Sequence, residues 1–280
     1  MVRAGTEAGP GGASQTWAVR SRLLVLVGVA LLATGCAAHD EAQAQGRPGP
    51  SVTASGPEVS GGPGLSAALL ARVPHFAAPP AAQPVSVPAG PSAGWYSAIP
   101  TTQPVAFITI DDGWTKDPHA LELFKAAHVP ITLFLEINAI KSDPGYFTQL
   151  QQAGAVIEAH TISHPELKGK SYDVQKHEIC GSADELGRLY GRRPLLFRPP
   201  FGDKDATTLR VVHDCGMKAA FFWRETTDKG IVRYQAGQQV KAGDIVLMHF
   251  RPAFVDDFLA VLKAIADAGL TPASLESYIS

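Results

Sequence analysis

Beyond Pro104, short apolar runs alternate with amphipathic stretches of helical period, and this alternation constrains the fold more than any other feature of the chain. Such a pattern indicates β/α units around a mainly parallel sheet. The apolar runs predict strands over residues 105–111, 131–136, 155–160, 195–199, 218–223 and 244–250, with a weaker seventh over residues 271–275. The amphipathic stretches predict helices over residues 118–128, 146–153, 171–190, 206–215 and 256–267. We therefore expect an α/β fold of six or seven units, arranged either as a (β/α) barrel or as an open doubly wound sheet.

The first 36 residues have the three parts of an export signal. Two arginines precede an uncharged apolar run over residues 23–32, and three small residues then stand before Cys36. The run is about half as long as a spanning helix needs, so we interpret it as the core of a signal peptide, with a short anchor helix as the alternative. Because small residues before a cysteine resemble a bacterial lipobox, we expect Cys36 to become the lipidated N-terminus. The protein would then be extracytoplasmic, anchored as a lipoprotein to the outer face of the cytoplasmic membrane, or secreted.

Residues 37–100 have the composition of a spacer. They hold 11 of the 22 prolines, together with clusters of Gly, Ser and Ala. Such a stretch buries too little side chain to offset the entropy lost on ordering. We expect an extended tether with at most a brief helix over residues 65–73, followed by a folded domain over residues 101–280.

Charge and cysteine content limit the partners and the redox state. The chain carries 24 basic and 26 acidic residues, for a formal net charge of −2. Without an excess of basic residues it has little with which to bind a nucleic acid backbone, so we exclude that class of partner.

Cys180 and Cys215 remain once Cys36 is assigned, and an oxidising compartment would allow them to form a disulfide. Two buried free cysteines are the alternative.

Reactive side chains gather at the ends of the predicted strands. Asp111, His160, Arg198 and His249 each lie at or just beyond the C-terminal end of a different strand. In both candidate architectures, that edge of the sheet is where active sites are built. We therefore expect these four residues to share one site.

Two carboxylates and two imidazoles in this set suggest a metal site. Asp111 and Asp112 stand together before Gly113, and adjacent carboxylates repel unless a cation or a base role uses them. His160 and His164 are four residues apart and can reach one ion if the chain curls after its strand. Two histidines with one carboxylate leave a coordination position open, which is typical of a catalytic zinc site. A solvated Asp-Asp-Gly turn and a chance surface pair of histidines are the alternatives.

Four motifs resemble those of the polysaccharide deacetylases with a NodB homology domain, carbohydrate esterase family 4. They are Thr-Ile-Asp-Asp-Gly at residues 109–113, His-Thr-Ile-Ser-His at 160–164, Arg-Pro-Pro-Phe-Gly at 198–202 and Leu-Met-His at 247–249. The motifs occur in the family's order, and the resemblance runs over about residues 103–277.

This resemblance implies a distorted (β/α) barrel of about seven units. It also implies one divalent metal ion, expected to be Zn²⁺, held by Asp112, His160 and His164. The implied reaction is hydrolytic removal of acetyl from an N-acetylated sugar, with Asp111 as the general base and His249 as the general acid. The residue types suit these roles, because a divalent ion activates water beside a carboxylate and histidine titrates in the range useful to an acid.

The resemblance also assigns secondary roles and shows two departures. Arg198 would pair with Asp111 and keep that carboxylate ionised, a purely structural ion pair being the alternative. Phe201 replaces the usual tyrosine, but the family role is a backbone N–H in the oxyanion hole, which phenylalanine also provides. The family's motif of aspartate followed by tryptophan is altered, since Asp228 matches the aspartate and Lys229 replaces its aromatic neighbour.

We therefore expect residues 101–280 to form a metal-dependent deacetylase domain acting on a carbohydrate polymer, either peptidoglycan or a chitin-like glycan. We expect a monomer that reaches the membrane through its lipid anchor and needs no organic cofactor. Two alternatives remain open. One is a non-catalytic carbohydrate-binding relative at the cell surface, which the altered motif suggests, and the other is a hydrolase of the same fold acting on a non-sugar amide.

Overall fold

The computed structural model describes residues 64–280. The expected signal peptide, Cys36 and the first part of the expected tether lie outside the described residues. Among the helices of residues 64–280, none is long and apolar enough to cross a membrane.

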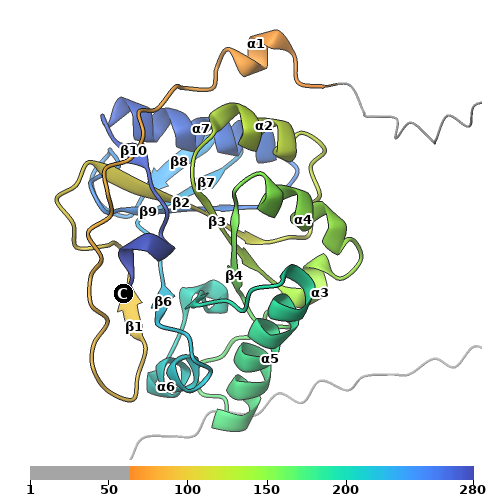
Figure 1. The fold of residues 1–280 in the computed structure, drawn as a ribbon, viewed down its shortest axis with the longest axis vertical. Coiled ribbons are helices and arrows are strands. Elements are labelled where there is room, and N and C mark those ends of the chain that lie inside the picture. The colour runs from red at the N-terminus through yellow and green to blue at the C-terminus, as the bar shows by residue number, and fades with distance from the viewer. Residues whose placement is uncertain (1–63) are drawn as a thin grey trace, which may run out of the picture. The chain divides into compact units, whose positions relative to one another are not determined.

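A curled, mainly parallel sheet lies at the centre of this domain (Figure 1). Its strands are β1 (Gly94–Tyr96), β2 (Val105–Asp112), β3 (Ile131–Leu135), β4 (Val156–Ala159), β5 (Leu196–Phe197), β6 (Ala219–Phe221), β7 (Glu225–Asp228), β8 (Ile231–Tyr234), β9 (Ile245–His249) and β10 (Thr271–Pro272). They hydrogen-bond in the order β1-β6-β5-β4-β3-β2-β9-β7-β8, and β10 pairs with the start of β2. Among these pairs, only β7 with β8 is antiparallel. The expected fold class, a distorted (β/α) barrel, is confirmed.

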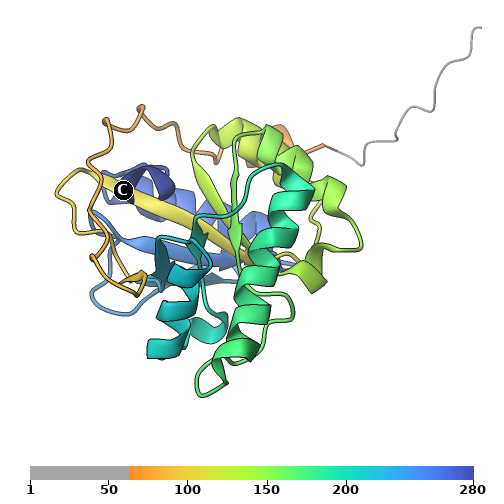
Figure 2. The same cartoon turned by 60° about the horizontal axis from the view of Figure 1, so that its bottom comes forward.

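Helices connect the parallel strands, as the sequence pattern predicts. They are α2 (Ala120–Ala127), α3 (Ile137–Ile140), α4 (Pro144–Gln152), α5 (Tyr172–Tyr190), α6 (Ala206–Asp214) and α7 (Phe254–Asp267), whereas the short α1 (Ala67–Leu70) precedes β1. Helix α2 packs beside α7, and α5 packs beside α6 (Figures 1 and 2). Strand β2 is buried over nearly its whole length because β3 and β9 flank it, which explains its almost continuous apolar run.

The structure differs from the expected tether over residues 64–100. Strand β1 pairs in parallel with β6, and Leu65, Val73 and Ile99 are buried in the hydrophobic cores. These apolar side chains contribute the burial that the surrounding proline-rich sequence lacks. The folded domain therefore begins well before residue 101.

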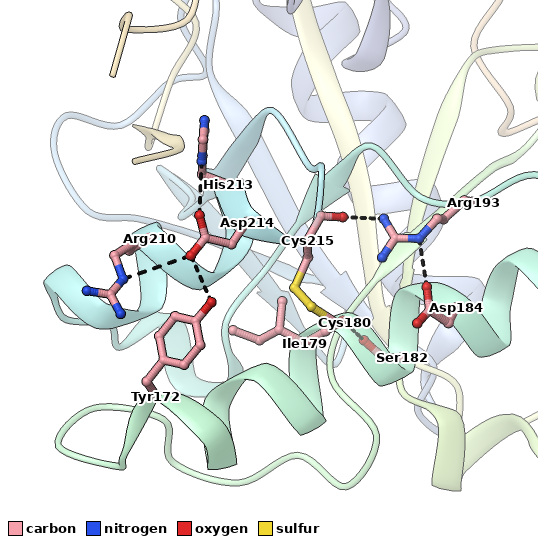
Figure 3. Close-up of a disulfide and its surroundings, with 10 residues drawn as sticks. All are labelled: Tyr172, Ile179, Cys180, Ser182, Asp184, Arg193, Arg210, His213, Asp214 and Cys215. Atoms are coloured by element: carbon pink, nitrogen blue, oxygen red, sulfur yellow. Dashed lines mark hydrogen bonds and ion pairs between the residues drawn. A yellow bond between two sulfur atoms is a disulfide. The ribbon is translucent and has the colours of Figure 1, made fainter. Parts of the chain in front are cut away.

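A disulfide joins the two remaining cysteines (Figure 3). Cys180 lies within α5 and Cys215 directly follows α6, and the two residues are 35 positions apart. Next to the disulfide, Arg193 donates hydrogen bonds to the Cys215 carbonyl and to Asp184 Oδ1. Of the two alternatives for these cysteines, the disulfide is confirmed, and it joins the middle of α5 to the end of α6.

Candidate metal and active site

Strands β2, β4 and β9 end at one cavity of about 420 Å³. Of the four residues that the sequence placed at this edge, three line the cavity, and the fourth, Arg198, pairs with Asp111, which does line it. The lining residues are Asp111, Asp112, His160, His164, Pro199, Phe201, Trp223, Thr226, Leu247, His249 and Arg251.

The turn after β2 brings both carboxylates to the cavity. Asp111 is only 2% exposed, and Asp112 has a left-handed backbone with a φ of 72°. At Gly113 the φ is 117°, and a Cβ there would lie 2.7 Å from Ile140 Cγ2 and 2.9 Å from Phe147 Cζ. This turn is therefore packed against the core and demands glycine, unlike the solvated turn considered as an alternative.

Both histidines of the second motif face Asp112. The Nε2 atoms of His160 and His164 lie 3.5 Å and 3.6 Å from Asp112 Oδ1. His160 Nδ1 is 2.7 Å from the carbonyl oxygen of Arg198, and because a carbonyl only accepts, Nδ1 carries the proton. Nε2 is therefore the nitrogen that faces Asp112, and once unprotonated it is free to bind an ion, as in histidines that bind metals through this nitrogen.

Electrostatics keep Asp112 charged and His164 neutral. Burial alone would raise the pKa of the Asp112 carboxyl, but its interactions with His160, His249 and His164 lower that pKa to about 2. Burial, followed by the neighbouring His160, lowers the pKa of His164 below its usual range. An ionised carboxylate and a neutral imidazole are the protonation states in which these side chains bind metal ions.

These three residues fit a divalent ion. One ligand atom from each of Asp112, His160 and His164 lies within 4.8 Å of the others. Asp112 Oδ1 is buried and has no hydrogen-bond partner within residues 64–280, which is costly unless another group satisfies it. Two imidazoles and one carboxylate are ligands that Zn²⁺ prefers, with a further coordination position left open.

Arg198 is completely buried behind Asp111. Its Nη1 donates hydrogen bonds to Asp111 Oδ1 at 2.7 Å and to Thr109 Oγ1 at 2.8 Å. Its Nη2 donates to the Phe222 carbonyl at 3.2 Å, and its guanidinium lies 4.5 Å from the centre of the Phe134 ring. The pair fixes Asp111 in place, and the carboxylate retains one edge toward the cavity, where Oδ2 lies 3.9 Å from His160 Nε2.

His249 approaches from the opposite side of β2. Strand β9 places it directly beside Asp111, whereas the two metal-site histidines follow β4, on the other flank. Burial lowers the pKa of His249 more than the nearby carboxylates of Asp111 and Asp112 raise it. Its Nδ1 is buried without a hydrogen-bond partner among the described residues, and Asp228 lies outside the cavity lining at the end of β7. The proposed match of Asp228 to the altered motif therefore gives His249 no carboxylate partner.

Aromatic side chains line the cavity or belong to the segments that form it. Phe201 is 64% exposed, has a φ of 59°, and packs its ring 4.7 Å from that of His164. Trp223 lines the cavity and stacks on Phe222 with ring centres 4.0 Å apart. Trp114, 59% exposed, follows the Asp-Asp-Gly turn and donates from Nε1 to Glu136 Oε2 at 3.0 Å. Apolar faces held open to solvent beside a polar site suit a ligand with its own apolar faces.

Sequence reasoning missed the residues that support the site. Glu136 and Glu178 are both buried, at 2% and 9% exposure, and contact the segments that carry the metal-site residues. A signal was available for Glu178, because it shares the spacing of Gln175, Ile179 and Ser182 on the buried face of α5. A charged residue on an otherwise inward-facing helix stripe needs a partner, and this pattern could have identified it.

Comparisons with known proteins identify the relatives of this chain. A family model described as polysaccharide deacetylase matches residues 98–220. An uncharacterised protein of Streptomyces coelicolor is 36% identical over 187 residues, which cover 65% of this chain and 75% of that protein.

More distant similarities point the same way. The peptidoglycan-N-acetylglucosamine deacetylase of Bacillus cereus is 28% identical over 152 residues, so the match covers 52% of this chain and only 55% of that relative. Among solved structures, a CE4 family pseudoenzyme from Bacillus anthracis has a TM-score of 0.59 at 18% identity, with 68% of this chain and 70% of that chain covered.

Proposed function

Because the chain belongs to the polysaccharide deacetylase family, we propose that it is a metal-dependent hydrolase that removes N-acetyl groups from an N-acetylated sugar polymer, either peptidoglycan or a chitin-like glycan. One observation carries the proposal. The three candidate ligands Asp112, His160 and His164 converge in the same cavity as a candidate base, Asp111, and a candidate acid, His249.

The ligand set supports Zn²⁺ as the ion held by Asp112, His160 and His164. When bound, a divalent ion supplies Lewis-acid chemistry for amide hydrolysis. The remaining roles belong to groups around that site.

Asp111 takes a proton from the attacking water, and Arg198 keeps its carboxylate in position through the 2.7 Å hydrogen bond. His249 gives a proton to the departing amine from the other flank of the reacting carbon, which agrees with its place on β9. The backbone N–H of Phe201 donates to the carbonyl oxygen as that oxygen gains negative charge. Because burial lowers the pKa of His249, the acid form is populated at lower pH than for an ordinary histidine.

The aromatic rings in and near the cavity support a sugar polymer as the substrate. Phe201, Trp223 and Trp114 offer flat apolar surfaces, against which the apolar faces of sugar rings pack. The relative from Bacillus cereus is a peptidoglycan-N-acetylglucosamine deacetylase, and a cell-wall glycan would be accessible to a protein anchored outside the cytoplasm. We accordingly propose an extracytoplasmic monomer, lipidated at Cys36, with residues 37–63 between the anchor and the domain.

A non-catalytic carbohydrate-binding protein is the second candidate. The unpartnered Nδ1 of His249 and the position of Asp228 away from the cavity favour it, because a catalytic acid usually has a second group that orients it. The solved CE4 family pseudoenzyme belongs to the same fold.

Acetate release distinguishes these candidates. The purified protein, stripped of metal and then supplied with Zn²⁺, should release acetate from peptidoglycan and from N-acetylglucosamine oligomers, and should do so only with the ion. His160→Ala and His164→Ala should lose bound zinc in elemental analysis, whereas His213→Ala, an exposed histidine on α6, should retain it. Asp111→Asn and His249→Ala should bind zinc yet release acetate about 10²- to 10⁴-fold more slowly. Glycan binding without acetate release from the zinc-loaded protein would instead establish the second candidate.

A further inference from the structure

The turn between the two metal-site histidines is held in an unfavourable backbone conformation. Thr161 has a φ of 70°, in the left-handed region that β-branched residues avoid, and His164 has a φ of 55° in the same region. His164 N–H donates to Thr161 Oγ1 at 3.0 Å, which closes the turn. The backbone N–H groups of Ile162 and Ser163 need acceptors from outside the turn. Such strain persists only where surrounding contacts determine the conformation.

Glu178 on α5 supplies those contacts. Its Oε2 accepts hydrogen bonds from the backbone N–H groups of Ile162 and Ser163, both at 2.9 Å. Its Oε1 accepts from Ser163 Oγ at 2.7 Å. One buried side chain thus binds both amides of the turn and its hydroxyl.

The same turn is fixed from two other directions. The N–H groups of Ile137 and Asn138, at the start of α3, donate to the carbonyls of Thr161 and Ile162 at 3.2 Å and 2.9 Å. Ile162 packs over Gly181 of α5, where a Cβ would lie 2.8 Å from its Cδ1. Helix α5 is itself tied to the end of α6 by the disulfide at Cys180, two residues from Glu178 (Figure 3).

We propose that Glu178 is a positioning residue for metal binding, which holds residues 161–164 so that His160 and His164 converge on Asp112. The inference rests on the proposed metal site and adds a residue that does not touch the ion. Its effect follows from geometry, because without Glu178 the two amides lose their acceptors and the left-handed residues can relax. The imidazoles would then occupy the required positions for only part of the time, and the affinity for the ion would fall.

Zinc affinity of the metal-free protein tests the proposal, measured by competition with a chromogenic chelator. Glu178→Met keeps the length of the side chain but offers no acceptor, and it should weaken zinc binding about 10- to 100-fold. Glu178→Gln should bind within a few fold of the unmodified protein, since its amide oxygen can accept from both backbone N–H groups while its NH₂ donates to Ser163 Oγ. Glu185→Met, at a partly exposed position of the same helix that contacts neither the turn nor the site, is the matched control and should leave the affinity unchanged.

Hydrogen exchange gives a readout that does not depend on the ion. In the metal-free protein the amides of Ile162 and Ser163 should be protected, and Glu178→Met should abolish that protection while β2 and β3 keep theirs. If Glu178→Met unfolds the protein, Gly181→Ala is the variant to use instead. Alanine favours the helix, while its methyl group displaces the Ile162 side chain of the turn. The zinc affinity should then fall while the free energy of unfolding stays the same.

The two proposals fail differently. Absence of zinc binding by the unmodified protein would refute the metal site itself. Zinc binding by the unmodified protein, with equal affinity in Glu178→Met or in its Gly181→Ala replacement, would overturn the role of α5 in positioning the turn.

Discussion

Replacing Arg198 should reveal how strongly the buried ion pair stabilises the domain. Arg198 is fully buried, and the side chain of Asp111 is 3% exposed, so water screens neither charge. Arg198→Met fills a similar volume but leaves the Asp111 carboxylate without its counter-charge. It also removes the hydrogen bonds to Thr109 Oγ1 and the Phe222 carbonyl.

Breaking a buried pair from one side costs about 3–5 kcal/mol, because the remaining charge is left uncompensated. For a domain of this size each kcal/mol lowers the melting temperature by about 2–4 °C, so Arg198→Met should melt about 10 °C lower. Arg188→Met is the matched control, since Arg188 pairs with Glu185 at the surface, where solvent screens the pair and its loss should barely move the melting temperature.

A double-mutant cycle separates the pair from the packing. The free energy of unfolding is measured in urea for metal-free Asp111→Asn, Arg198→Met and the double variant. The double variant should lose at least about 1 kcal/mol less than the two single variants lose together. Additive losses, or a loss in Arg198→Met no larger than in Arg188→Met, would contradict the claim that the two charges support each other.

Three further predictions concern other parts of the molecule. Burial and then the nearby Asp244 raise the pKa of Glu225 from 4.5 to about 8. The folded protein therefore holds a proton that the unfolded chain releases, and the free energy of unfolding falls as pH rises across that window. Glu225→Gln should flatten this part of a pH–stability curve and be about 1–3 kcal/mol more stable than the unmodified protein above pH 8. Replacing Cys180 and Cys215 with serine should lower the free energy of unfolding by about 3–4 kcal/mol in urea titrations, and an unchanged midpoint would count against a formed disulfide. Cys36→Ser should move the protein from the membrane fraction to the medium or leave its signal uncleaved, whereas unchanged fractionation would rule out the lipid anchor.

The strands and helices around the site were predictable because burial on both faces gives parallel strands a continuous apolar pattern. Strand β2 and helix α5 lie within two residues of their expected bounds. The hairpin of β7 and β8 was missed, since β7 consists of Glu-Thr-Thr-Asp and has no apolar alternation. Strand β1 was missed because its three residues follow a proline-rich stretch whose average composition favours disorder.

The candidate ligands could be named from sequence, whereas the contacts that hold them could not. Asp112 and His160 belong to short motifs in which residue type and spacing are informative. Glu178 comes 14 residues after His164 and reaches the turn only because α5 folds back over it, at the 2.9 Å hydrogen bond to Ile162. Contacts of that kind depend on how helices pack, and linear spacing does not encode them.

The pairing of β1 with β6 determines where the chain can be cut. A shortened protein starting at residue 98, where the family match begins, would lack β1, with the rings of Trp95 and Tyr96 that pack on Phe222 and Phe221. Strand β6 would then become the border of the sheet, with open backbone groups and an apolar flank available to another molecule. Such borders promote self-association, so a soluble recombinant domain should begin before β1, which starts at Gly94.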